Sequence, residues 1–199
     1  MNRRWHKLLK EYVEALIIAL ILALLIRTFV IQAFKIPSGS MKETLLIGDH
    51  LLVNKFLYGV RFPFVDYVIP VSDPEHSDII VFEYPEEPDK DFIKRIIGIP
   101  GDTIEIRNKE VYRNGEKLSE PYARHTDSRI VEGPRDNLIP FVVPADSYFV
   151  MGDNRDESYD SRWWRYVRRD QIRGKAWRIY WSWESLSDIR FGRIGQALH

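Results

Sequence analysis

Hydrophobic residues follow two different patterns along this chain, one near the N-terminus and one after residue 45. From Ala15 to Ile26 no charged residue interrupts an apolar run, whereas later apolar and polar residues alternate in short segments bounded by turn residues. The continuous run predicts a helix that is apolar on all sides, and alternation with a period of two predicts half-buried strands. We therefore expect a mainly β protein that follows one N-terminal apolar helix.

The alternating segments predict a mostly antiparallel β-domain. Those with the strand pattern are Asp49–Asn54, Asp78–Tyr84, Asp91–Ile97, Thr103–Ile106 and Ser147–Met151. Asn114-Gly115 predicts a type I′ hairpin turn, because both central positions require positive φ, and Pro100-Gly101 predicts a type II turn. The pattern leaves room for one short helix near the C-terminus, and residues 119–140, rich in polar residues and proline, are expected to form a small exposed excursion between strands.

The apolar run admits three interpretations: a membrane span, a cleavable signal peptide or a buried helix. A small-x-small cleavage site is missing downstream, because Ala33 has no small residue two positions earlier, and an uncleaved anchor therefore fits best. Basic residues precede the run at Arg3, Arg4, Lys7 and Lys10. The positive-inside rule keeps them in the cytoplasm, and Arg27 can extend outward from the far end. We expect residues 1–11 to be cytoplasmic, 12–33 to form the transmembrane anchor and 34–199 to lie outside the cytoplasm.

Composition limits the remaining classes. The 199 residues suit one domain, and 29 Lys and Arg balance 29 Asp and Glu, which argues against a nucleic-acid partner because such proteins usually carry a basic surface. The absence of cysteine excludes disulfides, thiolate metal sites and a cysteine nucleophile. The histidines, at positions 6, 50, 76, 125 and 199, have no metal-ligand spacing, and His50 beside Asp49 is only a weak candidate for a catalytic triad.

Ser38 and Ser40 stand in a glycine-containing segment just after the apolar run, which places two hydroxyls near a membrane surface. Ser40 followed three residues later by Glu43 also has the spacing of a capping box, so Ser40 can equally be the first residue of a short helix. The two roles are compatible, because the first backbone N–H groups of a helix are unpaired and can stabilise an oxyanion. Gly39 allows a substrate carbonyl to approach the backbone closely.

Lys94 and Arg95 lie inside an apolar segment that is expected to be a strand. Strand alternation places Lys94 on the face of Phe92 and Ile96, and Arg95 on the opposite face. Either the strand is partly exposed and both cations reach solvent, or one of them is buried. Burial lowers the pKa of a lysine, and a neutral lysine beside a serine is a general base for a nucleophile.

Polar residues are dense from Gly152 to Arg162, directly after an apolar strand. A calcium loop is a poor interpretation, because no glycine occupies its sixth position, no glutamate closes it, and two arginines interrupt it. The segment is therefore either a solvated acidic loop or a buried network of ion pairs and hydroxyl groups that orients a lysine.

Several segments resemble bacterial type I signal peptidases, which are membrane-anchored Ser/Lys endopeptidases that remove signal peptides. The matching segments are Ile36–Met41, Gly48–Asp49 with Val53–Lys55, Ser77–Phe82, Phe92–Arg95 with Gly98–Asp102, and Met151–Arg162. The resemblance implies that Ser40 is the nucleophile and Lys94 its general base, with an oxyanion hole made by the Ser38 hydroxyl and the Ser40 N–H. It also implies that Ser158 hydrogen-bonds and orients Lys94, and that Asp160 pairs with Arg162. Further supporting positions match at Asp153, Arg155 and Arg95.

The resemblance further implies shallow apolar pockets that accept small residues at the first and third positions before the cut. Positions that match the pocket lining are Phe34, Ile36, Pro37, Met41, Leu45, Val81, Phe92 and Ile93. Two residues depart from the family pattern, Glu43 where proline is more usual and Phe92 where tyrosine is frequent. The implied partners are signal peptides of secretory preproteins and the lipid bilayer of the bacterial cytoplasmic membrane, with no metal or cofactor.

Two other functions remain open on the sequence. A soluble Ser/Lys self-cleaving repressor-type protease shares the residue pair and a related β-fold, but it lacks an anchor. A membrane-tethered domain that only binds exported chains would have an inactive pair. Tryptophans at positions 163, 164, 177, 181 and 183 either form a surface at the lipid–water boundary or pack in the core and at its rim.

Overall fold

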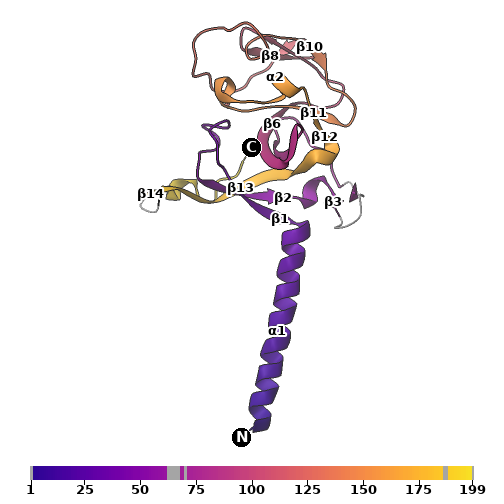
Figure 1. The fold of residues 1–199 in the computed structure, drawn as a ribbon, viewed down its shortest axis with the longest axis vertical. Helices are drawn as coiled ribbons and strands as arrows, with labels where there is room; N and C mark the ends of the chain where they lie inside the picture. Colours follow the sequence, from indigo (N-terminus) through magenta and orange to yellow (C-terminus); the bar gives the residue numbers. More distant parts are fainter. Residues whose placement is uncertain (1, 62–67, 70, 186–187, 199) are drawn as a thin grey trace.

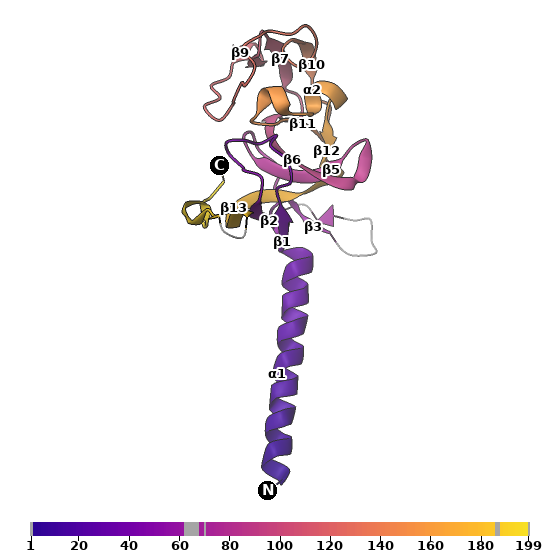
Figure 2. The same ribbon diagram turned by 60° about the vertical axis from the view of Figure 1, so that its left-hand side comes forward.

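The apolar N-terminal run forms one long helix, α1 (Asn2–Phe29), in a computed structural model that describes residues 2–61, 68–69, 71–185 and 188–198. This helix extends away from a β-rich body, as Figures 1 and 2 show. Its segment Lys7–Phe29 is long and apolar enough to cross a membrane, and none of it is buried inside the protein. The interpretation as a buried core helix is therefore wrong. Residues 1 and 199 and the side chains of Arg3, Arg4 and His6 lie outside the described part.

The helix ends earlier than the expected boundary at residue 33. Its last turn closes with Val30 N donating to Ile26 O at 2.9 Å, and the chain then enters strand β1 (Ile31–Lys35). Strand β1 pairs antiparallel with β2 (Asp49–Asn54), with Phe34 opposite Leu51. Pairing with β2 satisfies backbone groups that the helix would otherwise use, so the segment that follows Phe29 belongs to the body and not to the anchor.

The main sheet is antiparallel, in the order β1-β2-β13-β5-β6-β11-β12, with β14 paired to β13. Its remaining strands are β5 (Ile79–Tyr84), β6 (Glu87–Gly98), β11 (Ser147–Met151), β12 (Val167–Arg168), β13 (Ile172–Ser185) and β14 (Asp188–Ile189). A smaller sheet, in the order β10-β7-β8-β9, lies at the end of the body farthest from α1 (Figure 1). It contains β7 (Thr103–Arg107), β8 (Glu110–Arg113), β9 (Glu116–Lys117) and β10 (Leu138–Val142), and β3 (Val60–Arg61) pairs with β4 (Val68–Ile69).

Helical structure in the body is short. The elements are α2 (Ser161–Trp164) and the 3₁₀ turns Phe56–Tyr58, Arg155–Glu157, Arg169–Gln171 and Phe191–Arg193. The mainly antiparallel β prediction is thus confirmed, and so are both turns, since φ is 55° at Asn114, 84° at Gly115 and 90° at Gly101. The expected excursion at 119–140 is exposed over most of its length but ends inside β10.

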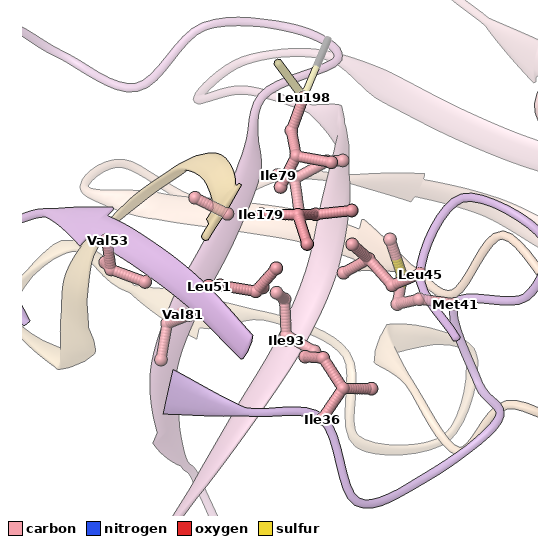
Figure 3. Packing of buried hydrophobic residues seen from close by; sticks show 11 residues of the cluster. Ile36, Met41, Leu45, Leu51, Val53, Ile79, Val81, Ile93, Ile179 and Leu198 are labelled. Carbon is pink, nitrogen blue, oxygen red and sulfur yellow. The ribbon is translucent and has the colours of Figure 1, made fainter. Parts of the chain in front are cut away.

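One hydrophobic cluster connects the sheet to the segment between β1 and β2 (Figure 3). Met41 and Leu45, from that segment, are fully buried against Ile36, Ile93 and Ile179. Burial of a Met or Leu side chain contributes about 1.5–3 kcal/mol. The two residues therefore hold the segment that contains Ser40 against the floor formed by the sheet.

Candidate active site

Ser40 lies in a turn between β1 and β2. Lys42 N donates to Gly39 O at 3.1 Å, and Leu45 N donates to Met41 O at 2.8 Å. These hydrogen bonds form turns that do not continue into a helix, so the expectation that a helix starts at Ser40 is wrong. The Ser40 carbonyl oxygen accepts a hydrogen bond from the Asn154 N–H at 3.1 Å, which joins the turn to the loop after β11.

Lys94 of β6 lies directly beside this serine. Its Nζ is 2.6 Å from Ser40 Oγ, and its side chain is 3% exposed, whereas Ser40 is 8% exposed. Burial lowers the pKa of Lys94 to about 8; Asp160 and Asp153 act in the opposite direction, and Arg162 adds to the lowering. A hydroxyl and an amine that loses its proton near neutral pH are therefore in direct contact.

The neighbouring Arg95 is also buried, with 1% of its surface exposed. The interpretation of β6 as a partly exposed strand whose two cations reach solvent is therefore wrong. Arg95 donates from Nε and Nη2 to the two oxygens of Asp153, at 2.9 and 2.8 Å, and from Nη1 to Ser77 O at 2.9 Å. Its guanidinium also lies 4.0 Å from the centre of the Tyr122 ring.

Asp153 connects β6 to the Ser40 turn. Besides Arg95, its carboxylate accepts a hydrogen bond from Thr44 Oγ1 at 2.5 Å. Its carbonyl oxygen accepts one from Arg124 N at 2.7 Å, so the excursion is attached at the same point. A buried carboxylate with charged and hydroxyl donors fixes the relative positions of the three segments that meet there.

Two further arginines after β11 have buried carboxylate partners. Arg155 pairs with Glu120 of the excursion at 2.6 Å, and Arg162 pairs with Asp160 at 2.8 Å, as the resemblance implied. Burial by itself raises the pKa of Asp160, but the charge and hydrogen bonds of Arg162, with further hydrogen bonds from the Gly152 N–H and Ser158, outweigh it, and the pKa lies below its usual range. The segment from Gly152 to Arg162 is therefore a buried network and not a solvated loop.

Ser158 does not make the expected hydrogen bond to Lys94. Its side-chain oxygen is buried and acts on the Asp160 carboxylate, whose pKa it helps to lower, instead of bonding to Lys94. It lies against Gly152, where an added Cβ would be 2.3 Å from Ser158 Oγ and 2.5 Å from the Ser40 carbonyl oxygen. The close approach of Gly152 to both serines is a feature that the sequence analysis missed.

Two candidate oxyanion donors have no competing partner. Ser38 is exposed, and within the described residues neither its hydroxyl nor the Ser40 N–H makes a hydrogen bond. Both belong to residues that line one pocket of about 340 Å³ together with Lys94. They are therefore available to a ligand in that pocket.

The pocket next to Ser40 contains only part of the predicted lining. Pro37, Phe92 and Ile93 line it. The other predicted residues support it from below: Ile36, Met41, Leu45 and Val81 are buried in the hydrophobic cluster, and Phe34 packs against that cluster. The sheet and the turn cover the first four almost completely, whereas Phe34 is half-buried; none of the five lines this pocket.

Sequence reasoning also missed several residues at this site. Asp91, Glu157 and Tyr159 line the pocket. Asn154 donates from Nδ2 to Gly39 O at 3.1 Å and to Glu157 Oε2 at 3.0 Å, and so holds the residue just before Ser40. Its position inside the polar segment after β11 was the only signal available, because the contact spans 115 residues of sequence.

The other candidates do not assemble into a site. Asp49 bonds to Ser182 Oγ at 2.6 Å and to Arg193 Nη2 at 2.6 Å, while His50 Nε2 has no partner in the described part of the chain. That arrangement is not a triad. Nor do the described residues contain a group of three His, Asp or Glu side chains placed to hold a metal. Trp163 and Trp177 are exposed, but the first lies in α2 and the second in β13, on different parts of the body (Figure 1).

A family model described as signal peptidase, peptidase S26 matches residues 9–181. The chain belongs to this signal peptidase family. It is 38% identical to a signal peptidase I of Pseudomonas aeruginosa, over 94% of this chain and 79% of the relative. It is 40% identical to a probable signal peptidase I-2 of Synechocystis, over 86% and 72%. A crystal structure of a signal peptidase I from Enterococcus faecalis superposes with a TM-score of 0.43 and 35% identity, over 52% of this chain and 97% of that one.

The two departures from the signal peptidase pattern have defined surroundings in this protein. Glu43 forms an exposed ion pair with Arg124 of the excursion. The Phe92 ring stacks on Tyr84, with ring centres 4.4 Å apart and planes inclined by 4°. The Glu43–Arg124 pair links the turn to the excursion. At position 92 the pocket is lined by a phenyl ring, which has no hydroxyl group.

Proposed function

We propose that this protein is a membrane-anchored serine endopeptidase that removes N-terminal signal peptides from exported preproteins. The observation that carries this proposal is the 2.6 Å contact between Ser40 Oγ and the buried Lys94 Nζ in a chain of the signal peptidase family. A serine hydroxyl becomes an effective nucleophile when a base in contact with it accepts its proton, and these two groups are placed for that.

In the proposed reaction, neutral Lys94 accepts the Ser40 proton as Oγ attacks the scissile carbonyl carbon. The tetrahedral intermediate collapses when the C–N bond breaks and protonated Lys94 donates its proton to the leaving amine. Water, deprotonated by Lys94, then hydrolyses the ester and restores Ser40. The lowered pKa of Lys94 supports this cycle, because a base is most effective when its pKa lies near the working pH.

The Ser38 hydroxyl and the Ser40 N–H are proposed to donate to the oxyanion. Their lack of partners within the described residues supports this role, since a donor already bonded to protein would first have to break that bond. The buried pairs Arg95–Asp153 and Arg162–Asp160 are proposed to keep the surrounding backbone fixed while charge develops.

The pocket next to Ser40 has an apolar side formed by Pro37, Phe92 and Ile93, which suits uncharged substrate side chains. The restriction to small side chains follows the signal peptidase family to which the chain belongs. We therefore propose that the substrate segment before the cut carries small residues at its first and third positions.

The anchor is proposed to cross the cytoplasmic membrane once, with the N-terminus inside. An apolar helix of 23 residues can cross a hydrocarbon core about 30 Å thick. Lys7 and Lys10 near its start and the β-body at its end support this orientation. The body would then lie at the outer membrane face, where the cleavage site of a signal peptide emerges.

The test is cleavage of a secretory precursor in detergent micelles by the wild-type chain and by Ser40→Ala, with the new N-terminus of the product sequenced. We expect wild type to cut after a small-x-small segment and Ser40→Ala to leave the precursor intact. A well-folded wild type that leaves it intact would refute the proposal and favour a domain that only binds exported chains. Cleavage of its own chain alone would favour the self-processing alternative.

A further inference from the structure

A second pocket, larger than the one beside Ser40, is lined in part by residues of the same segment between β1 and β2. Its volume is about 670 Å³, and Pro37 is the only lining residue that it shares with the pocket beside Ser40. Three basic side chains line it, from Lys35, Lys42 and Arg190, against one carboxylate, from Glu184. The proposed reaction uses none of these four residues.

The two lysines are free to bind a ligand. Both are exposed, and within the described residues neither side chain makes a hydrogen bond or ion pair. Lys35 stands at the end of β1, and the Lys42 side chain passes over Gly39, where an added Cβ would be 3.2 Å from Lys42 Cε. Two ammonium groups with no protein partner at one pocket favour an anionic occupant.

Arg190 supplies a fixed positive charge at the same pocket. Its side chain donates to Ser182 Oγ at 2.9 Å, Ile47 O at 2.6 Å and Trp183 O at 3.0 Å. Asp49 lies 3.8 Å from Arg190 Nη2 but is paired more closely with Arg193, at 2.6 Å. Protein contacts therefore hold Arg190 in place, while the ammonium groups of the two lysines remain available to donate hydrogen bonds to a ligand.

Strands that carry part of the pocket lining, β1 and β13, lie at the end of the body from which α1 departs. In both ribbon views β1, β2 and β13 are next to the end of α1, and the β7–β10 sheet is at the opposite end (Figures 1 and 2). Lys35 follows Phe29 by six residues, which limits its distance from the helix end to about 20 Å even if the chain is extended. Ile47 and Trp183 line the pocket, and tryptophan favours the lipid–water boundary.

From this geometry we infer that the pocket formed by Lys35, Lys42 and Arg190 binds the phosphate of an anionic phospholipid headgroup. Phosphates are the anions at the depth where the body meets the bilayer, and a basic side chain attracts them there. The acyl chains would continue beside Ile47 and Trp183 toward the membrane. The inference rests on the membrane anchoring proposed above and is independent of the Ser40–Lys94 chemistry.

Photo-crosslinking in a bilayer tests this inference. The full chain is placed in phosphatidylcholine nanodiscs that contain a trace of photoactivatable phosphatidylglycerol or, separately, photoactivatable phosphatidylcholine, and labelled peptides are mapped by mass spectrometry. We expect phosphatidylglycerol to label peptides from 35–48 and 183–190, and phosphatidylcholine to label them far less. Equal labelling by the two lipids would overturn the inference.

The double variant Lys35→Gln with Lys42→Gln should reduce the affinity for phosphatidylglycerol, and with it the labelling, about 30-fold. Each basic residue near an anionic surface contributes roughly a factor of five. The matched control, Lys90→Gln with Lys117→Gln, removes the same charge from residues that pair with Glu87 and Glu110 elsewhere on the body, and should keep the labelling. Lys35→Arg with Lys42→Arg should keep it too, which separates loss of charge from loss of fold. Equal loss in the control would overturn the inference.

Two further measurements distinguish lipid binding from the binding of free phosphate and from the Ser40–Lys94 chemistry. Millimolar inorganic phosphate should not displace the lipid label; complete displacement would identify a free-phosphate site and overturn the assignment to lipid. The Ser40→Ala chain should keep the label while losing cleavage, so that failure of the catalytic proposal and failure of this inference give different results.

Discussion

Lys94 and Arg95 are adjacent and buried on β6, yet their side chains have different surroundings. The Arg95 side is lined by a carboxylate that receives two hydrogen bonds, with a backbone carbonyl and an aromatic ring completing the environment. On the Lys94 side the only hydrogen-bond partner among the described residues is the Ser40 hydroxyl, and the Phe92 ring lies 5.4 Å from Nζ. The Arg95 charge is therefore paired directly with a carboxylate, whereas among the described residues Lys94 has no carboxylate within hydrogen-bond distance.

This difference separates a structural charge from a reactive one. A guanidinium stays protonated in a protein, and a bidentate carboxylate fixes it and its neighbours, whereas a buried lysine without such a partner tends to lose its proton. The same strand can therefore both brace the site and present a base to Ser40.

Removal of the reactive cation should have the largest effect on activity. Lys94→Met keeps an unbranched side chain in an apolar site, so the fold should remain while turnover falls by roughly 10²–10⁴-fold or more, as expected when a general base is lost. Cleavage kinetics together with thermal unfolding measure both properties. Near-normal turnover in a folded variant would remove Lys94 from the mechanism.

Removal of the compensating carboxylate should instead damage stability. Asp153→Asn leaves the Arg95 charge buried without its partner, and loss of one member of a buried pair costs about 3–5 kcal/mol in the free energy of unfolding. Denaturant unfolding measures the change. The double variant with Arg95→Met should be less destabilised than the sum of the two single variants, and strict additivity would contradict a direct interaction.

Loss of an oxyanion donor should lower the rate without affecting the fold. Ser38 is exposed and makes no protein hydrogen bond in the described residues, so Ser38→Ala should leave the unfolding temperature unchanged. The rate should fall roughly 10²–10³-fold at unchanged KM, because the donor acts on charge that appears only in the transition state. A rise in KM with normal kcat would assign Ser38 to substrate binding.

The pH dependence should follow the pKa of Lys94. Activity should rise with pH up to about 8, where the lysine becomes neutral. Between that pH and the higher pKa of an unfolded lysine, the unfolded chain binds more protons, so the stability of the fold should also rise with pH in this window. Rate profiles and unfolding curves against pH measure the two effects. A rate that stays flat to acidic pH, or a stability curve that Lys94→Met leaves unchanged, would contradict the neutral base.

The smallest effect is expected at the departure from the family pattern beside the nucleophile. Glu43 and Arg124 form an exposed pair, and exposed pairs contribute about 0–1 kcal/mol. Glu43→Gln should therefore change stability within that range and leave kcat almost unchanged. A large loss of kcat would show that the excursion controls the position of Ser40 through this pair.

Local patterns in the sequence were sufficient for the strands whose alternation is regular, and they failed for β13. Its side chains alternate between buried and exposed only until bulges shift the register near Arg178 and Trp181. A bulge places two residues opposite one and breaks the period of two. Periodicity therefore did not reveal this central strand of the main sheet, although its two neighbours, β2 and β5, were predicted.

Local composition and spacing were sufficient to predict the N-terminal apolar helix, the antiparallel β class and the residues able to act as nucleophile and base. The folded structure was needed to show that both cations of β6 are buried, that Arg95 and not Lys94 has a carboxylate partner, that Ser158 faces Gly152, and that Asn154 holds the Ser40 turn. These outcomes depend on contacts between segments far apart in the chain. The pKa of a buried group is set by the charges and donors that such contacts place within a few ångströms.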